Sequence, residues 1–80
     1  MDDQAMRIVE NYIIDNYATD GVPEFEVYIV WKSKILQNWK WLISSDLHDG
    51  MYYELTYNGN ENEYYLDAYK KIENKVIKLF

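Results

Sequence analysis

The chain of 80 residues carries 14 acidic and 8 basic side chains, for a net charge of −6, and 18% of its residues are aromatic. This aromatic content excludes a disordered chain, and the lack of any apolar run near the roughly 18 residues that a span needs excludes a transmembrane helix. Because cysteine is absent, disulfides, thiolate nucleophiles and cysteine-based metal sites are excluded as well. We therefore expect one small domain over residues 1–80, located in the cytoplasm and held together by packing.

An amphipathic helix is predicted over about residues 2–18. Apolar side chains recur there at spacings of three and four residues, with charged side chains between them, as on one face of a helix. The stripe consists of Ala5, Ile8, Val9, Tyr12, Ile13 and Tyr17. Gly21 and Pro23 follow and are expected to end the helix.

Two strands are predicted over about residues 25–35 and 39–45, because β-branched and aromatic residues alternate there with polar ones. If they form a hairpin, the apolar odd positions share one face only when the loop has an odd number of residues. This parity favours a three-residue loop, Leu36 to Asn38, with Asn38 in the left-handed region. All three tryptophans then fall in the core: Trp31, Trp39 and Trp41.

Two further strands are predicted over about residues 51–57 and 62–67. The turn Asn58-Gly59-Asn60-Glu61 lies between them, since Asn and Gly tolerate positive φ. We expect Tyr57 to pair with Asn62, which places the even positions of the last strand on the core face.

A second helix is predicted over about residues 67–79, with Asp67 as its N-cap. Its apolar stripe is Tyr69, Ile72, Val76 and either Leu79 or Phe80. The predicted fold is thus α+β, with an N-terminal helix, a four-stranded antiparallel β-meander and a C-terminal helix. Both helices are expected to cover the same face of the sheet.

The opposite sheet face is the candidate binding site. If both helices lie on one side, a half-apolar set of side chains remains in water, and tyrosine is enriched in protein interfaces. The candidate residues are Tyr28, Val30, Lys32, Lys34, Lys40, Leu42, Tyr52, Glu54, Glu63 and Tyr65. Such a face would suit a protein partner or a second copy of the chain, whereas no membrane partner is expected.

Charge follows the chain in blocks. Residues 1–27, 28–45, 46–69 and 70–80 carry net charges of −6, +3, −6 and +3. The acidic blocks would allow the chain to mimic DNA toward a nucleic-acid-binding protein. An alternative is a nucleic-acid-binding module that uses Lys32, Lys34 and Lys40 with stacking by Tyr28 or Trp39. The overall acidity makes nucleic acid an unfavoured partner.

A second alternative is a small metal-dependent enzyme around Asp46, His48 and Asp49. These residue types bind metals, but three of them in four residues lack the i, i+4 helical geometry or a second anchoring segment. No glycine-rich nucleotide loop and no serine triad can be assembled either. We therefore expect no enzyme activity, no cofactor and no metal.

Several strings in the second half of the chain are similar to those of a known family. They are Asp49-Gly50-Met51-Tyr52-Tyr53-Glu54, Thr56-Tyr57-Asn58-Gly59 and Tyr65-Leu66-Asp67-Ala68-Tyr69-Lys70-Lys71. Over about residues 27–78 the chain resembles short proteins from phages and prophages of Gram-positive bacteria, which form a family of unknown function. The resemblance implies a phage product in the host cytoplasm. By analogy it favours an accessory protein that binds and inhibits or redirects a host or defence protein.

Overall fold

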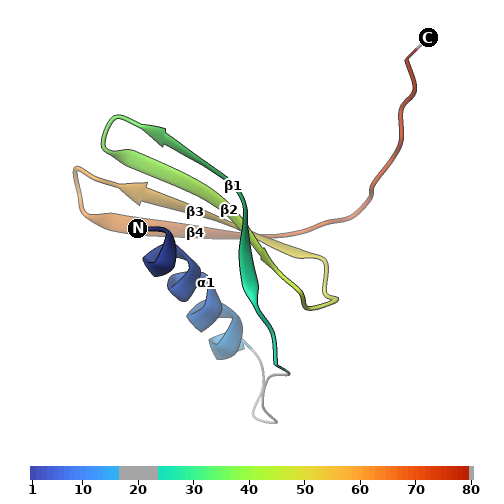
Figure 1. Ribbon diagram of the computed structural model, residues 1–80, viewed down its shortest axis with the longest axis horizontal. Coiled ribbons are helices and arrows are strands. Elements are labelled where there is room, and N and C mark those ends of the chain that lie inside the picture. Colours follow the sequence, from blue (N-terminus) through green and yellow to red (C-terminus); the bar gives the residue numbers. More distant parts are fainter. Residues whose placement is uncertain (17–23, 80) are drawn as a thin grey trace.

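The computed structural model describes residues 1–16 and 24–79 and combines one helix with a four-stranded antiparallel sheet (Figure 1). The elements are α1 (Asp2–Asn16), β1 (Val27–Ile35), β2 (Asn38–Ser45), β3 (Met51–Asn58) and β4 (Glu63–Lys70). The strands follow one another in the order β1-β2-β3-β4, so the predicted meander and the α+β class are confirmed. The predicted positions Tyr17, Gly21 and Pro23 lie outside the described residues. Within the described part of the chain, no helix is long and apolar enough to cross a membrane.

The core lies between α1 and one face of the sheet. α1 buries Ala5, Val9 and Ile13, which are spaced four residues apart and therefore lie on one side of the helix. They pack against the buried odd positions of β2 and β3, namely Trp41, Ile43, Tyr53 and Leu55. The predicted stripe is thus confirmed for Ala5, Val9, Ile13 and the partly buried Ile8, whereas Tyr12 is 37% exposed, and the odd core positions of these two strands are confirmed as well.

The first residue of α1 anchors the helix to the sheet. Trp41 is completely buried, and its indole Nε1 donates a hydrogen bond to Oδ1 of Asp2 at 3.1 Å. Lys32 Nζ donates to the other carboxylate oxygen at 2.6 Å. The hydrogen bond from Lys32, followed by that from Trp41, lowers the pKa of Asp2 below its usual value. One carboxylate therefore satisfies a buried donor and fixes the start of α1.

The first hairpin differs from the prediction at its turn. Ile35 pairs with Asn38, so the turn contains only two residues, and the positive φ of 57° belongs to Leu36 rather than to Asn38. A two-residue turn pairs odd with even positions. A β-bulge between Ile29 and Trp31 restores the odd–odd pairing at the base of the hairpin, where Ile29 lies opposite Ile43. The three-residue loop is therefore wrong, and the core pairing is reached by a bulge instead.

The second hairpin keeps the predicted face but not the predicted register. Tyr57 pairs with Tyr64 instead of Asn62, and Asn58 pairs with Glu63. The even positions of β4 still share the core-side face, as expected. At the turn, the backbone of Gly59 lies so close to Gln37 of the first turn that an added Cβ would be 2.3 Å from the Gln37 carbonyl oxygen. Close approach of the two turns is thus the reason for a glycine at position 59.

The predicted C-terminal helix is absent from the structure. Asp67–Lys70, expected to begin it, instead complete β4 through pairing with Met51–Glu54, and residues 71–79 have no regular secondary structure. Lys71 N still donates to Gly50 O at 2.8 Å, after which the chain leaves the sheet (Figure 1). Of the two helices expected on one face, the structure therefore contains only α1. Residues 67–70 form a strand instead of the first turn of a helix because hydrogen bonds to β3 satisfy their backbone N–H and C=O groups.

Candidate protein-binding face

Within residues 1–16 and 24–79, no helix lies on one face of the sheet, and we call it the open face. The side chains of two residues that pair across antiparallel strands project to the same side of the sheet. Since α1 covers the side of Trp41 and Leu55, the strand register identifies the residues of the open face. They are Tyr28, Trp31, Ser33, Ile35, Asn38, Lys40, Leu42, Ser44, Tyr52, Glu54, Thr56, Asn58, Glu63, Tyr65, Asp67 and Tyr69. Large apolar or aromatic members are exposed, among them Tyr28 (49%) and Trp31 (43%).

The structure brings most of the predicted site residues together on the open face. Seven of the ten lie there: Tyr28, Lys40, Leu42, Tyr52, Glu54, Glu63 and Tyr65. Val30 is the extra residue of the bulge and is exposed. The remaining two, Lys32 and Lys34, pair with Trp41 and Trp39 and so lie on the side of α1. Their assignment to the open face is corrected by the bulge, which reverses the facing of every residue from Trp31 to Ile35.

Trp31 is the main residue that the sequence pattern placed on the wrong side. It was expected in the core, but it pairs with Leu42 and lines a groove of about 520 Å³ that we call the Trp31 groove. The lining residues are Trp31, Ser33, Ile35, Asn38, Trp39, Lys40 and Thr56. Ile35 is 69% exposed. An exposed indole next to an exposed aliphatic side chain resembles the anchor pockets at the centre of protein interfaces.

Lys32 and Lys34 instead frame an aromatic stack on the other side. Their Nζ atoms lie 6.0 and 5.4 Å from the ring centroid of Trp39, which stacks on Trp41 with an interplanar angle of 11°. Lys40 projects to the open face and forms an ion pair with Glu54 at 3.3 Å. The three lysines proposed for nucleic-acid binding thus do not form one patch.

The β3–β4 half of the open face is acidic. Glu54 and Asp67 are directly opposite each other across the two strands. The phenol of Tyr65 donates a hydrogen bond to Oε2 of Glu63 at 2.6 Å, which raises the pKa of Tyr65. Tyrosine rings and carboxylates therefore alternate over this half of the face.

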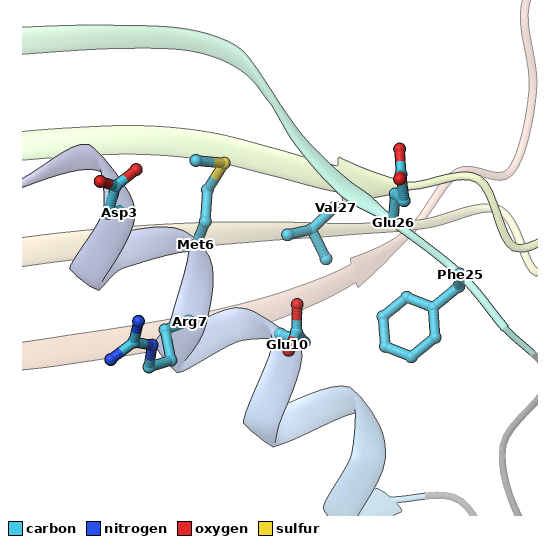
Figure 2. Close-up of a pocket in the computed structure, with 7 residues that line it drawn as sticks. All are labelled: Asp3, Met6, Arg7, Glu10, Phe25, Glu26 and Val27. Atoms are coloured by element: carbon cyan, nitrogen blue, oxygen red, sulfur yellow. The ribbon is translucent and has the colours of Figure 1, made fainter.

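A second cavity of about 540 Å³ lies between α1 and the start of β1 (Figure 2). Its lining combines Asp3, Met6, Arg7, Glu10, Phe25, Glu26 and Val27. In Figure 2 the carboxylates of Asp3 and Glu26 lie far apart along the lining, and that of Glu10 lies between them.

The loop with Asp46, His48 and Asp49, the residues of the metal-site alternative, has a structural role. Asp46 Oδ1 accepts a hydrogen bond from Glu26 N, just before β1, at 2.9 Å, and Asp49 Oδ1 accepts one from Met51 N, at the start of β3, at 3.1 Å. Both carboxylates thus bind backbone amides at the beginning of strands. Within residues 1–16 and 24–79, no three His, Cys, Asp or Glu side chains are grouped as a metal site would require.

The fold and the site together define a small α+β protein with one helix-covered sheet face and one open aromatic face. The chain belongs to a family of unknown function (DUF6275), which matches residues 2–79. Comparisons with curated proteins and with solved structures gave no match. The expected membership of a family of unknown function is thereby confirmed.

Proposed function

We propose that this chain is a non-enzymatic protein-binding module whose Trp31 groove receives an apolar side chain of the partner protein. The groove carries the proposal, because it combines the exposed rings and aliphatic surface of Trp31 and Ile35 with a polar margin from Asn38 and Lys40. Apolar anchors surrounded by polar side chains are the usual energetic centre of an interface.

The resemblance to phage and prophage proteins favours a host or defence protein as this partner. The chain would then be an accessory protein in the bacterial cytoplasm that inhibits or redirects its target. The structure adds a geometric argument for the kind of contact: the groove is open on the sheet surface, so it accepts a protruding side chain rather than an enclosed small molecule.

Site-specific photocrosslinking tests the proposal. A photoreactive residue replaces Ser33, which lines the groove, and in the matched control it replaces Asn11, which is exposed on α1. After irradiation in a lysate of the bacterial host, we expect a discrete adduct from position 33 and not from position 11. Equal labelling from both positions, or no adduct from position 33, would refute the proposal.

The partner recovered in this way is then used for affinity measurements. Removal of an anchor tryptophan typically costs about 2 kcal/mol or more, so Trp31→Ala is expected to weaken binding by about 30-fold or more. Ile14→Ala is the control, because Ile14 is an exposed aliphatic residue (46%) on α1. An unchanged affinity for Trp31→Ala would exclude the groove as the binding site.

A further inference from the structure

The C-terminal segment, residues 71–79, exposes most of its apolar surface. Ile72, Val76, Ile77 and Leu79 are 95%, 79%, 76% and 94% exposed, and in Figure 1 the segment runs away from the sheet and from α1. Four aliphatic side chains in eight residues form an unusually apolar surface for a segment that is exposed to water. A surface that covers them would stabilise the segment.

The sequence of this segment is suited to a helix that forms on contact. Ile72, Val76 and Leu79 follow one another at four and three residues, which places them on one side of a helix. Lys75 and Lys78 are three residues apart and form an adjacent basic stripe, which Lys71 precedes. A helix of eight residues is marginal in water, so it needs a docking surface.

The β3–β4 half of the open face complements this helix. It presents Tyr52, Tyr65 and the 52% exposed Tyr69 as apolar surface, and Glu54, Glu63 and Asp67 as carboxylates. Lysines of the segment would face the carboxylates of Glu63 and Asp67, whereas Glu54 is already paired with Lys40. Apolar and charged side chains of the segment thus both find counterparts on this half of the face.

A second copy of the chain is the occupant that the geometry favours. The hydrogen bond from Lys71 N to Gly50 O prolongs the course of β4, which directs the segment away from the open face of its own sheet. Apolar side chains of this size carry roughly 60–120 Å² each. Reciprocal docking of Ile72, Val76 and Leu79 from two segments on two faces would therefore bury roughly 700–1,400 Å², counted over both partners, which reaches the lower part of the range of stable interfaces.

We propose that two copies of this chain exchange their C-terminal segments, so that residues 72–79 of each copy form a helix on the β3–β4 half of the other copy's open face. The Trp31 groove is lined by residues of β1 and β2, with only Thr56 from β3 at its edge, and stays accessible. This dimer is therefore independent of the partner protein proposed above, and each proposal can fail without the other.

Sedimentation equilibrium of the full chain, combined with circular dichroism, tests the exchange. We expect a dimer for the wild type, and at least a tenfold weaker dimer for the segment variant Val76→Asp and for the face variant Tyr65→Ala/Tyr69→Ala. Ile14→Ala is the control and is expected to dimerise like the wild type. Thermal unfolding confirms that both variants fold, which we expect because Val76, Tyr65 and Tyr69 lie outside the core.

Mixing the two defective variants gives the decisive result. The segment variant retains an intact face, and the face variant retains an intact segment, so one intact contact can form between them. We expect the labelled variants to form a heterodimer, measured by energy transfer, although each alone is monomeric at the same concentration. A monomeric wild type would overturn the proposal, and loss of helical signal from such a monomer in Val76→Asp would assign the face to the chain's own segment. A dimer that persists unchanged in Val76→Asp would likewise overturn it.

Discussion

The contact between the two hairpin turns gives the sharpest stability prediction. Replacing Gly59 with alanine places a Cβ 2.3 Å from the carbonyl oxygen of Gln37 and 2.8 Å from its Cβ and Cγ. The nearest atom belongs to the backbone, so rotation of the Gln37 side chain cannot relieve the overlap. Insertion of a methyl group into a filled site typically costs about 1–3 kcal/mol.

The turns must therefore move apart in Gly59→Ala, and two hydrogen bonds would lengthen with them. Gly59 N donates to Asn38 Oδ1 at 3.0 Å, and Gln37 Nε2 donates to Asn60 Oδ1 at 2.6 Å. For a domain of this size, a loss of 1 kcal/mol lowers the melting temperature by about 4–8 °C. We expect Gly59→Ala to unfold at least about 4 °C below the wild type.

Chemical denaturation of wild type, Gly59→Ala and Glu61→Ala provides the assay. Glu61 is an exposed residue of the same turn, and substitutions at such positions usually change stability by less than about 0.5 kcal/mol. If the unfolding free energy of Gly59→Ala lies within that margin of Glu61→Ala, the packing of the two turns described above is incorrect.

Three further predictions concern the core, the helix anchor and the acidic half of the open face. Leu55→Ala, at a completely buried position, is expected to lower the unfolding free energy by about 2–5 kcal/mol, whereas Leu36→Ala, at an 81% exposed turn position, should have little effect in the same denaturation assay. The lowered pKa of Asp2 means that its carboxylate stabilises the fold above the ordinary carboxyl pKa and that this contribution disappears as pH falls through the lowered pKa. The stability difference between wild type and Asp2→Asn should accordingly shrink on acidification, and a difference independent of pH would count against the anchor. Glu63→Gln should lower the pKa of Tyr65 toward its ordinary value, as followed by NMR titration of the tyrosine ring carbons; an unchanged titration would mean that the phenol does not donate to Glu63.

Local periodicity predicted most of the fold. The stripe of α1 and the alternation of β2 and β3 identified the buried Val9, Ile13, Trp41 and Leu55, because each of these elements packs on one continuous side. Strand limits were close as well: β2 begins at Asn38, one residue before its predicted start, and β4 extends to Lys70 rather than ending at residue 67.

The facing of the hairpin tip could not be predicted from the sequence. The predicted three-residue loop would pair Ile29 with Ser45, whereas the two-residue turn with a bulge pairs it with Ile43; both place Ile29 on the core face, and alternation does not distinguish them. The facing of the residues differs only between the bulge and the turn, which is where Trp31 and Lys32 exchange sides. The sheet face predicted for the candidate residues was therefore right where the strands are regular and wrong at Lys32 and Lys34.

The C-terminal prediction failed for a different reason. Tyr69, Ile72 and Val76 have helical spacing, but alternation of Tyr65, Asp67 and Tyr69 also suits an edge strand. The choice depends on hydrogen bonds to β3, which are long-range and carry no local signature.

The bulge at Val30 divides β1 into two parts whose odd-numbered residues face opposite sides of the sheet. At the base, odd positions such as Ile29 belong to the core; at the tip, the odd position Trp31 belongs to the surface. If Val30 instead paired regularly with β2, the alternation of side chains would place Trp31 on the side of α1 and Lys32 and Lys34 on the open face. The pairing of this one residue, rather than the chemistry of any side chain, thus determines whether this end of the open face offers an aromatic or a basic surface.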